Sequence, residues 1–427
     1  GSRAQNRWKA LYFAYHALHS DCQRKHTYSI TIEDNHVSLW YFSRSHSAKS
    51  QEFDLLDVRA VVHALSALIF STVEDLGYDA NIRRISERDE DSKEDQLRYV
   101  YRLHNRFFKT LKCRDEYDDL YIIGRATRVW EVIEVTSFDN IAPLPKAQRM
   151  ILRDVWLGHD NDTEREIQEK IFAHCDELGR NFPPENDPRL HGVDDATRSL
   201  LRERLKDGSY KELFLTIEAD YRGEMSKPRA EGYTPAPRIY EEPVYLHQEA
   251  KKAGSDPHRG STSRANSIPD AAFPSQSPPS VPRQYKPRQR NFVVYREVCS
   301  ALHELDDLYD ILFLVSWIHR DVSSGNILSF AGRGKLSDLE YVKEFDLSLG
   351  GRSSDPKTGT LIFMAVELHS GVTTYQERHF PMRIQDFSTT NRGRVASANP
   401  RTAVRHNFQH DVESIFWVLT WIVFTHI

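Results

Sequence analysis

The chain has 427 residues, of which 39% are hydrophobic and 28% are charged, and its formal net charge is −5. This length fits one large domain with insertions or two domains of ordinary size. The slight acidity gives no general case for nucleic-acid binding. No run of about 18 apolar residues occurs in the sequence, so no membrane span is predicted.

The cysteines are few and widely spaced. None belongs to a C-x-x-C pair, which argues against a zinc site and against a disulfide framework; they are Cys22, Cys113, Cys175 and Cys299. A reducing compartment, cytoplasmic or nuclear, is therefore expected.

The N-terminal part of the chain predicts a small α/β unit. Aromatic and apolar spacing indicates a short helix over Arg7–His16, and two alternating runs, Tyr28–Ile32 and Val37–Phe42, predict a hairpin. Apolar residues at three- and four-residue intervals from Leu55 to Leu76 predict a helix with one buried face, ended by Gly77. No residue here suggests chemistry, so a packing role is predicted.

The next elements alternate between strands and helices. Two apolar-alternating runs joined through Gly124 predict a hairpin over Leu120–Val135, and Met150–Trp156 reads as another strand. Thr163 is a plausible cap for a helix over 163–172, and Asp194–Leu205 predicts an amphipathic helix.

The composition then changes. Residues 222–290 are rich in Pro, Ser, Arg and Gly and are predicted to be disordered, because such a segment buries too little apolar surface to offset its ordering entropy. The basic residues at 282–290 could bind an acidic partner, although a solvated linker is the other interpretation. A strand over Asn291–Val298 and one helix over Leu302–Val315 follow.

The stretch W-I-H-R-D-V-S-S-G-N-I-L, residues 317–328, carries the chemistry. Asp321 and, five positions later, Asn326 have the spacing of a phosphoryl-transfer catalytic loop. Asp338 follows in S-D-L-E-Y, just after the strand signal over Gly334–Leu336. Further on stand G-T-L-I-F-M-A-V-E-L at residues 359–368 and an apolar run that opens at Asp411.

These motifs resemble those of the fungal-type protein kinases, a branch of the eukaryotic protein kinase-like superfamily. The resemblance covers Leu120 to the C-terminus and, more loosely, Tyr28–Asp79. It implies an α+β, bilobal kinase-like fold with a β-rich N-lobe, a mainly helical C-lobe and an N-terminal α/β extension. It also implies ATP and Mg²⁺ as cofactors and a protein substrate.

The resemblance implies roles for the C-terminal motif residues. Asp321 would accept the substrate proton, and Asn326 and Asp338 would bind magnesium. The structural and regulatory positions would be His319 tied to Asp411, Arg320 receiving an activation-segment phosphate, and Thr360 and Glu367 in the segment that receives the polypeptide. Ser353, Ser354 and Thr358 are candidate phosphate acceptors.

The resemblance also implies a nucleotide site in the N-lobe. Gly124 and Arg128 would lie near the phosphates, and the backbone from Glu297 to Cys299 would form the adenine hinge. Arg153 stands where the family has its ATP-positioning lysine, and its cation would act on the phosphates while pairing with a helix carboxylate. That carboxylate is predicted to be Glu166, with Glu164 as the alternative.

The implied division is an extension over 1–115, an N-lobe over 116–221, an insertion over 222–290, and the hinge with a partial C-lobe over 291–427. Because Ile427 ends inside an apolar run, the kinase domain is expected to be incomplete at its C-terminus. Three functions remain open: an active protein Ser/Thr kinase, a pseudokinase scaffold in which Arg153 impairs catalysis, and a small-molecule phosphotransferase.

Overall fold

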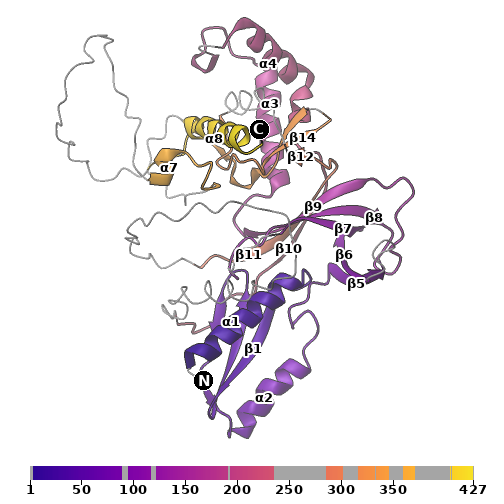
Figure 1. The fold of residues 1–427 in the computed structure, drawn as a ribbon, viewed down its shortest axis with the longest axis vertical. Helices are drawn as coiled ribbons and strands as arrows, with labels where there is room; N and C mark the ends of the chain where they lie inside the picture. The colour runs from indigo at the N-terminus through magenta and orange to yellow at the C-terminus, as the bar shows by residue number, and fades with distance from the viewer. Residues whose placement is uncertain are drawn as a thin grey trace, which may run out of the picture.

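A computed structural model of the protein describes residues 3–88, 95–116, 122–190, 193–234, 285–301, 316–331, 333–345, 359–370, 404 and 406–426. Its fold is mixed α/β, with strands in four sheets. In Figure 1 a first α/β unit lies at one end, a large sheet in the middle, and helices with the shorter sheets at the other end. Within these residues, no helix has the length and apolar character needed to cross a membrane.

The first unit, residues 3–79, is built on the predicted hairpin. Strands β1 (His26–Glu33) and β2 (His36–Ser43) pair antiparallel along their whole length. The short strands β3 (Ser47–Lys49) and β4 (Phe53–Asp54) both pair with β2. Helix α1 (Arg3–Ser20) is longer than predicted, and its alanine and leucine side chains pack on the β2 aromatic rings; this cluster contains Ala10, Ala14, Leu18, Trp40 and Phe42.

Helix α2 (Val58–Ile69) corrects one prediction. Asp57 caps its N-terminus, but none of its residues is buried, so the predicted buried face is wrong. Apolar side chains such as Val58 and Ile69 are 70% and 72% exposed. The apolar periodicity is real, but the helix is covered only in part: Leu68 is partly buried and lines a hollow with Ala10 of α1 and Ile30 of β1.

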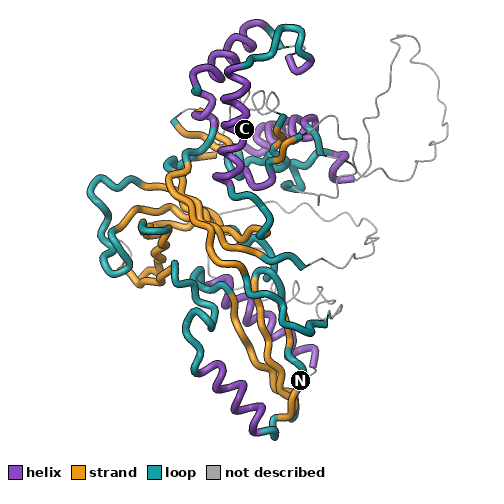
Figure 2. The backbone as a smooth tube through the Cα atoms, turned by 180° about the vertical axis from the view of Figure 1, so that it is seen from behind, coloured by secondary structure: helices purple, strands orange, loops and turns teal. Residues whose placement is uncertain are grey.

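The large sheet is antiparallel, with strand order β10-β11-β9-β8-β7-β6-β5. Figure 2 shows its strands crossing the middle of the molecule with a strong twist. Its members are β5 (Ile82–Arg88), β6 (Asp95–Leu103), β7 (Arg106–Glu116), β8 (Arg128–Val135), β9 (Arg149–Gly158), β10 (Ile217–Met225) and β11 (Arg288–Tyr295). The sheet starts at Ile82 and therefore crosses the predicted boundary between residues 115 and 116.

The predicted hairpin over 120–135 differs in its first strand. The strand that precedes β8 and pairs with it is β7, which ends at Glu116, and residues 122–127 belong to no strand. The segment predicted to be disordered begins inside β10 and ends inside β11. Its residues 235–284 lie outside the described residues.

Two helices that the sequence predicts lie beyond the sheet, and they pack together. They are α3 (Glu164–Arg180) and α4 (Asp195–Asp207). The short helix η1 (Pro188–Leu190) lies between them in the chain, and η2 (Ser209–Leu213) follows α4. The apolar faces of α3 and α4 share one core with residues of the catalytic stretch, including Trp317, Leu336 and Leu339. The two helices thus pack against the segment that contains the predicted catalytic residues.

Short elements complete the described chain. Strand β14 (Ile327–Phe330) pairs with β12 (Ser300–Ala301) and β15 (Arg333–Leu336), and β13 (Trp317–Ile318) pairs with β16 (Lys343–Glu344). The last elements are η3 (Leu339–Tyr341), α7 (Val366–Ser370) and α8 (Phe408–His426). The predicted helix over 302–315 and the acceptors Ser353, Ser354 and Thr358 lie outside the described residues.

Candidate active site

The loop between β13 and β14 brings Asp321 and Asn326 together. The Asn326 Nδ2 atom donates to the backbone carbonyl of Asp321 at 2.8 Å. The Asp321 carboxylate accepts the backbone N–H of Thr360 at 2.9 Å and its hydroxyl at 3.0 Å. Gly359, with φ of +123°, supplies a backbone conformation that residues with a side chain rarely adopt. The segment predicted to receive the substrate is therefore bonded directly to the predicted proton acceptor.

A buried carboxylate fixes the start of this loop. Asp411 in α8 accepts the backbone N–H of His319 at 2.6 Å and that of Arg320 at 3.0 Å. His406 places Nε2 3.1 Å from the same carboxylate. His319 is fully buried and lies 3.2 Å from the Ser337 carbonyl through Nε2. The structure thus brings His319 and Asp411 together, through the histidine backbone.

The loop that carries Asp338 is bonded to the catalytic loop. The backbone N–H of Ser337 donates to the Asn326 carbonyl at 2.9 Å. Asp338 itself has φ of 62°, and Arg320 has φ of 70°; such values are uncommon in residues with a side chain and cluster at functional sites. The residue before Asp338 is therefore hydrogen-bonded directly to Asn326.

The donor atoms of Asn326 and Asp338 fit a magnesium ion. Because Nδ2 of Asn326 is engaged with Asp321, the amide oxygen is the atom left to face a cation. An amide oxygen and a carboxylate are ligands of the hard type that Mg²⁺ takes, with phosphate oxygens and water completing the octahedron. Among the described residues no group of three His, Cys, Asp or Glu side chains forms a metal site.

Five buried or partly buried charged groups, Asp338 among them, meet beside the catalytic loop. We call Arg125, Arg153, Glu164, Asp338 and Glu340 the charge cluster. Arg153 contacts three carboxylates, at 3.0 Å to Glu164, 2.9 Å to Asp338 and 3.2 Å to Glu340. Arg125 pairs with Asp338 at 3.4 Å and also with Glu340. The predicted metal ligand is thus held by two guanidinium groups.

Within the charge cluster, the pKa values of Asp338 and Glu340 shift in opposite directions. Burial works against ionisation of Asp338, yet the guanidinium groups of Arg153 and Arg125 keep its pKa below the usual range. Burial raises the pKa of Glu340, and the charge of Asp338 adds to this effect. Asp338 therefore stays ionised to lower pH than Glu340.

The carboxylate partner of Arg153 is Glu164, so the choice of Glu166 is wrong for this ion pair. Glu166 instead completes a capping box at the start of α3: its side chain accepts the Thr163 N–H at 2.6 Å, and the Thr163 hydroxyl accepts the Glu166 N–H at 3.3 Å. Glu164 is the first residue of the helix and turns toward β9.

The position of Arg128 differs from the prediction that it lies near the phosphates. Arg128 opens β8, is buried, and donates to the carbonyls of Leu18 at 3.0 Å and His19 at 2.7 Å at the end of α1. A phosphate contact through this guanidinium is thus contradicted. The Gly124 N–H donates to the Arg44 carbonyl at 3.1 Å, which ties the turn to the first unit.

The predicted hinge follows β11. The buried Glu297 side chain accepts from Thr216 at 2.9 and 2.8 Å and pairs with Lys335 at 3.0 Å, so its carboxylate serves an internal network. Its pKa is lowered despite burial, through the bonds from Thr216 and Lys335. The half-buried Cys299 packs with Leu328 of β14 in one apolar cluster. Cys299 therefore lies among apolar side chains, whereas Glu297 lies among polar partners.

Two further predicted groups find internal partners. Glu367 pairs with His410 at 3.0 Å. In the basic segment 282–290, Arg290 is buried and binds Asp154 at 2.9 Å and Asp79 at 3.2 Å. Arg290 is therefore not available to an acidic partner molecule.

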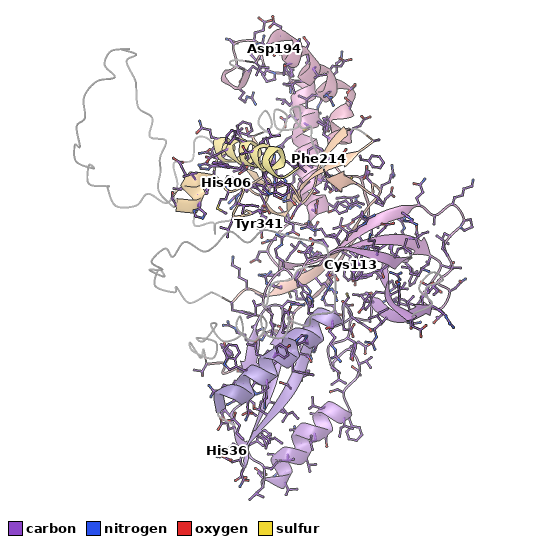
Figure 3. The ribbon with its side chains drawn as sticks, in the orientation of Figure 1. His36, Cys113, Asp194, Phe214, Tyr341 and His406 are labelled. Carbon is purple, nitrogen blue, oxygen red and sulfur yellow. The ribbon has the colours of Figure 1, made fainter. Side chains whose placement is uncertain are left out.

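The sequence prediction missed Arg125, Glu340 and His410 as members of these networks. A signal existed for Arg125, because the turn G-R-A-T-R contains two arginines and only one was chosen. The spacing could not tell which arginine faces Asp338. Figure 3 places Tyr341, the residue after Glu340, between the large sheet bearing Cys113 and the helix near His406.

The mixed α/β fold, the bonded Asp321 and Asn326 loop, and the buried Arg153–Glu164 pair define a protein kinase-like chain. The chain belongs to the fungal protein kinase family, whose family model matches residues 2–423, and this confirms the resemblance seen in its motifs. No curated protein matches the sequence significantly.

Proposed function

We propose that the protein is a Ser/Thr kinase that transfers the γ-phosphoryl group of ATP to a protein hydroxyl. Family membership supports kinase-like chemistry. In this proposal Asp321 receives the hydroxyl proton, and Asn326 with Asp338 holds Mg²⁺, which supplies charge neutralisation at the phosphates.

One observation carries the proposal: a single bonded unit joins the three residues that this chemistry needs. Asn326 is bonded to the Asp321 carbonyl and accepts from Ser337, the neighbour of Asp338. Phosphoryl transfer depends mainly on positioning and on stabilising charge, so a rigid spacing of these groups is what catalysis requires.

Asp321 also orients the acceptor hydroxyl in this proposal. Its carboxylate is held by the Thr360 N–H and hydroxyl, which leaves lone pairs that can accept a substrate O–H. The contact with Thr360 favours a polypeptide substrate over a small molecule, because it couples the proton acceptor to the segment expected to bind the polypeptide.

The finer division of the chain belongs to the same proposal. We infer a β-rich lobe around the large sheet and a second lobe around the catalytic loops, with the nucleotide between them. The apolar cluster around Cys299 and Leu328 would face the adenine. An intracellular location and regulation through Arg320 are parts of this proposal too.

A pseudokinase scaffold is the second candidate, and the charge cluster favours it. Arg153 contacts three carboxylates, so its cation is already engaged, and Asp338 is held by guanidinium groups where magnesium would bind. A chain that could not release these contacts would keep the fold without catalysis.

Calorimetry on folded protein tests the proposal. ATP is titrated with and without Mg²⁺ into the wild type, Asp338→Ala, and the control Glu134→Gln, whose carboxylate pairs with Arg106 away from the site. The kinase proposal expects magnesium-dependent binding that is lost only in Asp338→Ala. If the folded wild type does not bind ATP, the kinase proposal is wrong and the pseudokinase scaffold is the function that remains.

Transfer is measured separately with a mixture of Ser and Thr peptides. Asp321→Asn should bind MgATP like the wild type and lose at least about 100-fold in transfer rate, because general-base help is worth about 10²–10⁴. Equal transfer rates for both proteins would remove Asp321 from the mechanism.

A further inference from the structure

Arg125 reaches the candidate active site without a role in the proposed function. It stands in the turn between β7 and β8, yet its guanidinium pairs with Asp338 and Glu340 and lies 4.7 Å from the centre of the Tyr341 ring. Its side chain is 24% exposed. Arg125 is therefore a cation that is fixed at Asp338 and still open to solvent.

The Glu340 carboxyl group lies between the two arginines. The Glu340 side chain is 4% exposed and contacts both Arg125 and Arg153. The turn holds it in place, because Asp338 has positive φ and the next residue, Leu339, is 1% exposed in the helical core. Within the described part of the chain, Glu340 Oε1 and Arg125 Nε are buried without a hydrogen-bond partner. The pairing therefore leaves hydrogen-bonding capacity unused.

The charges of the cluster do not balance. Glu164, Asp338 and Glu340 carry three negative charges when ionised, against two positive charges on Arg125 and Arg153. Guanidinium groups bind carboxylates and phosphates with the same planar pairs of N–H donors. A phosphate chain beside Asp338 would meet repulsion from the Glu340 carboxylate, and attraction from both arginines.

We propose that Arg125 and Arg153 together form the phosphate-binding site for a metal-bound nucleoside triphosphate, and that Glu340 occupies this site when nucleotide is absent. The inference rests on the proposed function and deepens it. Phosphate oxygens displace the Glu340 carboxylate from both guanidinium groups, and Asp338 is released to the metal. Glu340 is thus an internal competitor that lowers nucleotide affinity.

The sharpest variant is Glu340→Gln. It replaces the carboxyl group that contacts both arginines with an amide of the same shape, and two carboxylates remain against two guanidinium groups, so the fold should persist. Urea unfolding of each variant checks this point. Arg125→Gln removes one of the two phosphate-binding cations, and Glu134→Gln is the control because it neutralises a carboxylate paired with Arg106 elsewhere on the sheet.

Two ligands are titrated by calorimetry: MgATP, and tripolyphosphate without metal. Tripolyphosphate tests the arginine pair alone, since it needs neither the adenine site nor magnesium. We expect Glu340→Gln to bind both ligands on the order of tenfold more tightly than the wild type, and Arg125→Gln to bind both on the order of tenfold more weakly. Glu134→Gln should match the wild type.

The outcomes separate this inference from the proposed function. If the wild type binds MgATP and Glu340→Gln binds both ligands no more tightly, the inference is wrong and the kinase proposal stands. If no protein binds MgATP while Glu340→Gln gains affinity for tripolyphosphate, the kinase proposal is wrong and the phosphate site stands. Unchanged affinity of Arg125→Gln removes Arg125 from the site, and no binding of either ligand overturns both proposals.

Discussion

Single buried arginine residues each bind several carboxylates in this protein. Arg153 serves three carboxylates at the candidate active site, whereas Arg290 joins Asp154 and Asp79 between the large sheet and the first unit. Removing one partner of such a group leaves the others buried without a counter-charge, which costs far more than losing an exposed pair.

Arg290→Ala should lower the free energy of unfolding by about 3–5 kcal/mol, because the carboxylates of Asp154 and Asp79 would remain buried. Arg83→Ala is the matched control: its partner Asp139 is exposed, so a change below about 1 kcal/mol is expected. Urea unfolding followed by tryptophan fluorescence measures both, and similar losses in the two variants would contradict the argument.

Arg153→Lys should lower the free energy of unfolding by about 1–3 kcal/mol, since one ammonium group cannot serve three carboxylates at once. The same change loosens the hold on Asp338, so magnesium-dependent ATP binding should tighten. Urea unfolding and calorimetry give the two values. Weaker binding together with unchanged stability would contradict both expectations.

Residue spacing predicted the catalytic-loop positions but not every partner. Asp321, Asn326 and Asp338 were chosen from their spacing, and they lie in one bonded unit. Glu164 was only the alternative, although T-x-x-E at 163–166 is a capping-box pattern that assigns Glu166 to the helix end. That local rule leaves Glu164 free to reach β9, and applying it would have given the right choice.

At the scale of elements, helices α2 and α3 show that periodicity does not determine burial. Both have apolar residues at helical intervals, but α3 packs on α4 and the catalytic stretch, whereas α2 has no buried residue. A sequence pattern indicates which face of a helix is apolar. Whether that face is buried depends on the packing of another element against it.

Ile171→Ala in α3 should lower the free energy of unfolding by about 2–5 kcal/mol, because Ile171 is fully buried in the helical core. Leu65→Ala in α2 is the matched control, since Leu65 is 45% exposed and should change stability by less than about 1 kcal/mol. The midpoints of urea unfolding compare the two. A large loss at Leu65 would mean that α2 is covered in solution.

The local elements were predictable where short-range signals are strong. The hairpin β1–β2, strand β9 and the capped helices α3 and α4 follow from alternation, turn residues and caps. Strands β5 to β7 carry many charged residues and gain their stability from cross-strand neighbours far along the chain. Their place in the large sheet therefore could not be read from local pattern.

At the scale of the whole molecule, acid should act first on the unit that contains residues 3–79. Burial lowers the pKa of His26 and of His46 to about 4, from an ordinary value of 6.5. Both rings lie 5.2 Å from the ring of Tyr41. Between pH 6.5 and 4 the unfolded chain binds these protons and the folded chain does not, so stability falls as pH falls through this window.

The double variant His26→Gln, His46→Asn should have a flatter dependence of stability on pH between 6.5 and 4 than the wild type. Urea midpoints at several pH values give both curves. Parallel curves would show that carboxylates, and not these histidines, dominate acid unfolding.

The position of Asp411 also sets an order of events during synthesis. The N–H of His319 meets its acceptor 92 positions further along the chain. At about 5–20 residues per second, the ribosome needs roughly 5–18 s to add those residues. During that interval the emerging catalytic loop has no Asp411 to bond with, so the kinase-like centre can take its final form only after most of the chain has been translated.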